Sequence, residues 1–189
     1  MRIKLALLIL TCCIALRASA EPVRYALQPE LSTVGFSYIL AGDRISGQIP
    51  LKIAEITIDF DKVSQSSVRA VLDAAGADAG PLYADQAMHG DSVLATARFP
   101  EIVFASTKVV PSGSGALVSG PITIRGVTRP ITLNASIFRQ RGSQEGDRSR
   151  LTVVLRGTLK RSAFGAIGFG GLVADEISLS IVARIQREG

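Results

Sequence analysis

Few side chains in this sequence of 189 residues are of the types that perform covalent or metal chemistry. The only histidine is His89, and no Gly-x-Ser-x-Gly segment supplies the exposed serine that a Ser-His-Asp site requires, so we interpret His89 as a loop residue that caps local structure. Asp59 and Asp61 flank Phe60 and would project from one face of a strand. Paired carboxylates there can bind calcium or share a proton, but they are more often solvated. These residues predict no catalytic site and no metal site.

The first 20 residues have the order of a secretory signal peptide. Arg2 and Lys4 precede an apolar run over residues 5–16, and Ala18-Ser19-Ala20 form a small-residue cleavage pattern. The run is too short to span a bilayer, although an uncleaved membrane anchor is the alternative interpretation. We therefore predict a signal peptide over residues 1–20 and a protein that is periplasmic or secreted.

Removal of this peptide changes what the composition implies about partners. Both cysteines, Cys12 and Cys13, lie in it, so the mature domain predicted over residues 21–189 would have no disulfide and no thiolate metal ligand. Of the 21 basic residues three lie in the peptide, which leaves 18 against 16 acidic residues. So small an excess of positive charge predicts no nucleic-acid partner.

Apolar and polar residues alternate through most of the mature chain. Every second side chain is apolar in about eight or nine short segments, which Gly, Ser, Asp and Pro separate. A change of phase after the segment 45–53 predicts a turn or bulge near Ala54 and Glu55. The alanine-rich stretch 79–97 lacks alternation, and we expect one or two short helical segments there, the first ending at Gly90. The pattern predicts an all-β antiparallel barrel or sandwich.

Residues 120–137 have the pattern of a β-hairpin with Gly126 in its turn. Glycine takes the positive φ that a tight reversal needs, and the apolar face of the hairpin would form a wall of an enclosed space. Arg125 and Arg129 lie beside the turn. They would tie it down, pair with acidic neighbours, or meet a phosphate or quinone head group.

Three segments of this sequence together resemble the motifs of the YceI-like family of secreted lipid-binding barrels. They are FPEIVFASTKV at 99–109, VSGPITIRGVTRPITL at 118–133 and LKRSAFG at 159–165. The looser similarity extends over about residues 24–186. The chain departs from the family pattern at Leu31 and Leu40, where histidines are common, and at Ala163, where an acidic residue is usual. The matching positions are Phe99, Pro100, Ile102, Phe104, Ser106, Thr107, Gly120, Thr123, Gly126, Val127, Thr128, Pro130, Arg161, Ser162, Phe164 and Gly165.

The resemblance implies an all-β, eight-stranded antiparallel barrel of the lipocalin type that holds an isoprenoid lipid, either a quinone or a polyprenyl chain. It implies a periplasmic carrier rather than an enzyme, with no cofactor besides the non-covalently bound lipid. A transient contact with a membrane or a membrane protein is expected, and the oligomeric state is left open. The predicted ligand-binding side chains are Phe36, Tyr38, Phe60, Phe104, Ile124, Leu133 and Phe164.

Two other functions are consistent with the same residues. The first is an enzyme that acts on a hydrophobic substrate in the barrel with His89 or the Asp59 and Asp61 pair. The second is an interaction or stress-response protein whose barrel is filled by its own side chains, because a barrel of eight strands is just wide enough either to be packed solid or to hold one small ligand.

Overall fold

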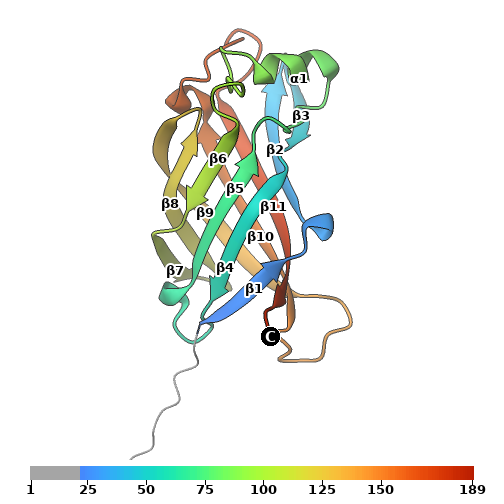
Figure 1. The fold of residues 1–189 in the computed structure, drawn as a ribbon, viewed down its shortest axis with the longest axis vertical. Coiled ribbons are helices and arrows are strands. Elements are labelled where there is room, and N and C mark those ends of the chain that lie inside the picture. The colour runs from blue at the N-terminus through green and yellow to red at the C-terminus, as the bar shows by residue number, and fades with distance from the viewer. Residues whose placement is uncertain (1–21) are drawn as a thin grey trace, which may run out of the picture.

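The computed structural model describes residues 22–189, so the predicted signal peptide over residues 1–20 lies outside the described residues. Strands and one short α-helix make up most of the described chain (Figure 1). In chain order the elements are β1 (Val23–Leu27), η1 (Pro29–Leu31), β2 (Thr33–Leu40), β3 (Asp43–Gln48), β4 (Leu51–Ile58), η2 (Val63–Gln65), β5 (Ser67–Asp73), α1 (Leu82–His89), β6 (Glu101–Ala105), β7 (Lys108–Ser112), β8 (Gly115–Ile124), β9 (Val127–Arg139), β10 (Arg150–Lys160), η3 (Arg161–Phe164) and β11 (Glu176–Arg187).

The strands close into a barrel with eight positions, and every strand pairing is antiparallel. The pairing order runs β1-β4-β5-β6-β8-β9-β10-β11, and β1 pairs with β11 to close the ring. Three of these positions are each formed by two consecutive strands. One is shared by β1 and β2, which both pair with β11, and another by β6 and β7, which both pair with β8. The third is shared by β3, which pairs with β2, and β4, which pairs with β1. The predicted eight-stranded antiparallel barrel is confirmed.

A bulge in β4 changes which side chains face the interior. The register of β4 against β5 shifts between Leu51 and Ile53, slightly earlier in the chain than the position near Ala54 and Glu55 that the sequence predicts. The alternation over segment 45–53 predicts that Ile53 shares the apolar face of Leu51, but Ile53 is 46% exposed, so this prediction is wrong. Beyond the bulge, Ala54 and Ile56 are the side chains of β4 that face the interior, because one extra residue exchanges the two faces of a strand.

The hairpin between β8 and β9 turns through Arg125 and Gly126, which have φ of 52° and 71°. The positive φ predicted for Gly126 is confirmed, and two successive positive values are typical of a type I′ turn. The Arg125 guanidinium donates to the carbonyl oxygens of Gly165 (2.7 Å) and Asp91 (2.7 Å). Arg125 therefore fastens two loops to the hairpin through main-chain atoms rather than through an acidic side chain.

Helix α1 and two loops cover the upper end of the barrel as drawn in Figure 1. The helix ends before Gly90, as predicted. Of the one or two helical segments expected in this stretch one forms, and residues 91–98 make turns. The loop 161–175 is held by Arg161, which is 9% exposed. Its guanidinium donates to four main-chain carbonyl oxygens, those of Ala166 (2.6 Å), Gly168 (2.7 Å), Val173 (3.1 Å) and Ala174 (3.2 Å).

The lower end of the barrel carries the loop 140–149 between β9 and β10 (Figure 1). A buried cluster of Tyr25, Ile58, Leu151 and Ile185 packs close to this end, and the Tyr25 hydroxyl donates to the Arg148 carbonyl oxygen (2.9 Å). The Arg187 main-chain N–H of β11 also donates to the Ser149 carbonyl oxygen (2.7 Å), so β1 and β11 both hold the end of this loop.

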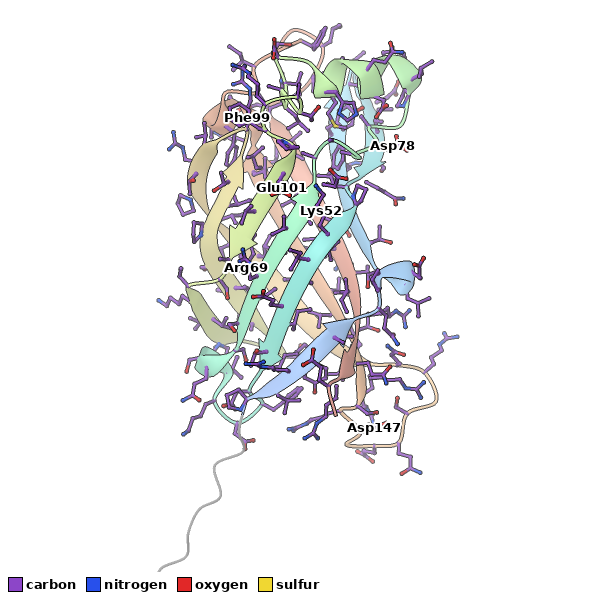
Figure 2. All side chains as sticks on the ribbon, viewed as in Figure 1. Lys52, Arg69, Asp78, Phe99, Glu101 and Asp147 are labelled. Atoms are coloured by element: carbon purple, nitrogen blue, oxygen red, sulfur yellow. The ribbon has the colours of Figure 1, made fainter. Side chains whose placement is uncertain are left out.

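The outer face of the barrel is polar, as the alternation predicts. Figure 2 shows Lys52, Arg69 and Glu101 on the outside of β4, β5 and β6. The Lys52 ammonium lies 3.3 Å from Glu101 and 3.5 Å from Asp73, but such exposed pairs contribute little to stability. None of the helices in residues 22–189 is long and apolar enough to cross a membrane.

Candidate ligand-binding cavities

A cavity of about 760 Å³ occupies the lower and middle part of the barrel. Inward-facing side chains of all eight barrel positions line it, and most are Ile, Leu, Val, Ala or Phe. Phe60, Phe104 and Leu133, which the sequence predicts to face a ligand, are among them. This volume lies within the usual range of roughly 300–1,000 Å³ for small-molecule sites.

A second cavity of about 430 Å³ lies between the upper end of the barrel and its cover. Tyr38 and Phe164 line it, and the Tyr38 hydroxyl donates to the Ala79 carbonyl oxygen (2.8 Å), so the ring presents only its apolar atoms. Much of the remaining wall comes from α1 and the loop 161–175. Sequence reasoning missed Tyr83, Met88 and other apolar side chains of this wall, because they do not lie in an alternating segment.

The two cavities share part of their walls. Phe36 and Ile124 line both, so each of the seven predicted side chains faces one cavity or the other, while their role in binding stays a prediction. The upper cavity therefore adjoins the lower one, and the two follow each other along the barrel axis. The side chains that belong to both walls are Phe36, Ile49, Ile102, Ile124, Leu159 and Leu179.

The position of the Phe36 ring between the cavities depends on a glycine. A Cβ added to Gly47 would overlap the ring and the Asp78 carbonyl oxygen, so only glycine leaves room for this placement. Phe36 also stacks on Tyr38, with ring centroids 6.0 Å apart and an angle of 23° between the rings. Gly47 is thus required for the shape of the wall, which its place in an alternating segment does not reveal.

Polar residues line the lower cavity mainly near its lower end. They come from the end of β4, the start of β5 and the loop after β9, and they include Thr57, Asp59, Ser66, Arg139 and Arg148. The apolar remainder and this polar end give the combined space an amphiphilic character. Such a lining suits a ligand with a long apolar chain and one polar group.

Asp59 and Asp61 do not form the strand pair that the sequence predicts. Strand β4 ends at Ile58, and the chain turns immediately, so Asp61 is exposed while Asp59 is only 2% exposed and faces the lower cavity. The Asp59 Oδ1 atom accepts hydrogen bonds from the main-chain N–H groups of Asp61 (2.9 Å) and Lys62 (2.7 Å). The carboxylate closes a turn, which is a frequent role of aspartate.

His89 lies at the last position of α1 and belongs to local structure. Its Nε2 atom is 3.7 Å from Asp85 Oδ1, and its Nδ1 atom is 3.4 Å from Thr96 Oγ1. Neither His89 nor Thr96 lines either cavity. The arrangement agrees with the interpretation of His89 as a capping residue.

Burial and hydrogen bonds shift the pKa of three groups near the cavities. Burial raises the pKa of Tyr38 and that of Tyr25. The main-chain N–H and the hydroxyl of Ser162 donate to the Asp175 carboxylate (2.8 Å each) and lower its pKa. The last contact joins the two ends of the loop 161–175 that covers the upper cavity.

The family described as the YceI-like domain matches residues 25–185 of the chain. UPF0312 proteins of Vibrio parahaemolyticus serotype O3:K6 and Yersinia pestis (strain Pestoides F) are 30% identical over 107 residues and 29% identical over 123 residues. These segments are 56% and 65% of this chain. The chain spans 53% and 64% of those relatives, between about half and two thirds of their length.

Solved structures with the same fold come from two other bacteria. BcnA of Burkholderia cenocepacia is 22% identical, has a TM-score of 0.74, and covers 84% of this chain and 99% of its own. The YCEI protein of Campylobacter jejuni is 23% identical, has a TM-score of 0.60, and covers 76% of this chain and 84% of its own. At such identities the similarity establishes the barrel fold.

Proposed function

Because the chain belongs to the YceI-like domain family, we propose that it binds and carries an isoprenoid lipid, a quinone or a polyprenyl chain, in its two adjoining cavities. The observation that carries this proposal is the long apolar space of about 760 Å³ and about 430 Å³ within a closed barrel. Burial of an apolar chain contributes roughly 0.8 kcal/mol per methylene group. Part of this is lost because the chain is immobilised.

The two alternative functions fit these cavities less well. A barrel filled by its own side chains would leave no space of this size. An enzyme would need reacting groups at the cavity wall, but His89 lies outside both cavities and Asp59 is occupied with a turn through one oxygen. A carrier needs only apolar walls and a polar end.

We infer from the N-terminal sequence that the carrier is exported. The basic residues, the apolar run and Ala18-Ser19-Ala20 have the order of a signal peptide, and a periplasmic or secreted protein would follow from its cleavage. An intact mass that begins at or near Glu21 would support this, whereas an exported protein that retains residues 5–16 would contradict it.

We further infer that the lipid passes through the upper cover while the protein is in contact with a membrane. Large apolar side chains are exposed on this cover, from α1 and from the loop 161–175, and several of them also line the upper cavity. They carry no charge, so the contact would use apolar insertion rather than attraction to anionic lipids. The exposed side chains are Leu82, Tyr83, Ile167, Phe169 and Leu172.

Flotation with vesicles of phosphatidylcholine tests the membrane contact. The wild type should float with the vesicles, and Phe169→Ser combined with Leu172→Ser should reduce the floating fraction at least about threefold. Phe138→Ser, which removes an exposed apolar side chain of β9 that lines neither cavity, serves as the control. Equal flotation of all three proteins would exclude this surface as the contact.

Displacement of the fluorescent probe N-phenyl-1-naphthylamine from delipidated protein tests the carrier proposal. Geraniol, farnesol and geranylgeraniol differ by one isoprene unit each. Every added unit should strengthen binding by at least about tenfold, because its methylene and methyl groups are buried in the apolar space. Affinity that does not depend on chain length would contradict the proposal.

A further inference from the structure

One oxygen of the Asp59 carboxylate has no hydrogen-bond partner within the described part of the chain. Oδ1 accepts two main-chain N–H groups, but Oδ2 is buried and unpaired. Asp59 is only 2% exposed, and it is among the residues that line the polar end of the lower cavity. A buried acceptor without a donor is unfavourable, and most such groups in folded proteins are paired.

The surroundings of Asp59 leave the ligand space as the place from which a donor can come. The Asp59 main-chain N–H donates to Ser66 Oγ (3.0 Å), and the Ser66 hydroxyl lies against the Asp59 carbonyl oxygen (3.4 Å), so this neighbour is already engaged. The Arg148 guanidinium lies over the Phe60 ring, 4.1 Å from its centroid, and makes no ion pair with Asp59. No cation within the described residues comes within 4 Å of this carboxylate.

We propose that Asp59 selects lipids whose polar end donates a hydrogen bond, which Oδ2 accepts at the lower end of the cavity. The class of ligand is an isoprenoid alcohol or phenol. Its hydroxyl lies near Asp59, and its chain extends upward past Leu133 and Phe36 toward the upper cavity. An aldehyde or an oxidised quinone offers only acceptors to Oδ2, and a phosphate adds a negative charge beside the carboxylate.

This inference rests on the carrier function, and the test separates the two. Farnesol and farnesal have the same chain and nearly the same size, but only farnesol has a donor. Displacement of N-phenyl-1-naphthylamine measures both affinities. The wild type should prefer farnesol by about 10- to 100-fold, which is the usual effect of a hydrogen bond to a charged group.

Asp59→Asn is the decisive variant because it keeps the turn. The asparagine carbonyl can still accept the N–H groups of Asp61 and Lys62, while an NH₂ group replaces Oδ2 and exchanges an acceptor for a donor. The preference for farnesol should fall below about threefold, and farnesal should bind at least as well as it binds to the wild type. Asp61→Asn makes the same change of charge on an exposed neighbour and should leave the preference unchanged.

The outcomes separate the inference from the carrier function. Binding of both ligands by the wild type without a preference, or tighter binding of farnesyl phosphate than of farnesol, would overturn the role of Asp59 and leave the carrier function intact. Binding of neither ligand would contradict the carrier function itself. Thermal midpoints of the variants show whether the turn is retained, and Asp59→Glu gives a second carboxylate variant whose preference for farnesol should persist if Asp59→Asn unfolds.

Discussion

Replacing Leu133 with tryptophan tests whether the lower cavity holds the chain of the ligand. Leu133 is buried in β9, and its side chain passes over Gly157 of β10 into the cavity wall. An indole exceeds the leucine side chain by about two or three water volumes, ~60–90 Å³ at ~30 Å³ each. The cavity of about 760 Å³ can absorb that volume.

The magnitudes follow from this comparison of volumes. A ligand chain that loses contact for about two methylene groups loses ~1.6 kcal/mol, or roughly 10- to 20-fold in affinity. The stability cost should stay below about 1 kcal/mol, because the larger side chain enters empty space. A filled core would instead lose roughly 1–3 kcal/mol through overpacking.

Probe displacement by geranylgeraniol and urea unfolding of the same preparation measure both quantities. Asn134→Trp is the matched control, because the adjacent side chain of β9 is exposed on the outer face. It should change neither affinity nor stability beyond about twofold and about 0.5 kcal/mol. A stable Leu133→Trp protein with unchanged affinity would place the ligand elsewhere, and a loss of 1–3 kcal/mol would show that the wall has no room.

Three further predictions concern the turn, the cover and the tyrosines. Gly126→Val should cost at least about 1 kcal/mol in urea unfolding, because a β-branched residue is strained at positive φ and its Cβ would lie 2.7 Å from the Phe99 ring; identical midpoints would refute the turn assignment. Arg161→Met should cost at least about 2 kcal/mol and expose the loop 161–175 to proteases, because four buried or half-buried carbonyl oxygens lose their donor; a protease-resistant, equally stable variant would contradict this. In a Tyr83→Phe background, absorbance at ~295 nm reports only Tyr25 and Tyr38, whose raised pKa means that the folded state holds their protons more tightly than the unfolded chain. The stability that these two tyrosines give the folded protein is therefore complete below about pH 10, and it is lost as the pH rises through their folded pKa. Phenolate formation in the folded protein at the same pH as in free tyrosine would contradict their burial.

Alternation made the barrel predictable from the sequence. Because one face of every strand is wet and the other apolar, segments such as 131–137 indicate both a strand and its inward side chains. The phase change in β4 also predicts a bulge, but the predicted position lies slightly too late in the chain, because Ile53 is apolar although it faces solvent. An exposed isoleucine breaks the rule that apolar positions mark the inner face.

The cavities depend on properties that alternation does not encode. Their volume follows from how far the walls stand apart and from glycines such as Gly47, which lets the Phe36 ring lie across the barrel. The upper wall comes from irregular segments that Arg125 and Arg161 hold through main-chain carbonyls. The sequence identifies Asp59 as a carboxylate beside Phe60. Its burial could not be predicted, because it depends on β4 ending at Ile58, one residue earlier.

Native mass spectrometry of protein purified from exporting cells without detergent tests the central claim most directly. The mass of the complex gives the mass of any bound molecule, and organic extraction identifies it. We predict one isoprenoid lipid with a hydroxyl-bearing polar end per chain, with reduced occupancy in Leu133→Trp and normal occupancy in Asn134→Trp. A protein that carries no lipid, and that takes up none when incubated with geranylgeraniol, would contradict the account.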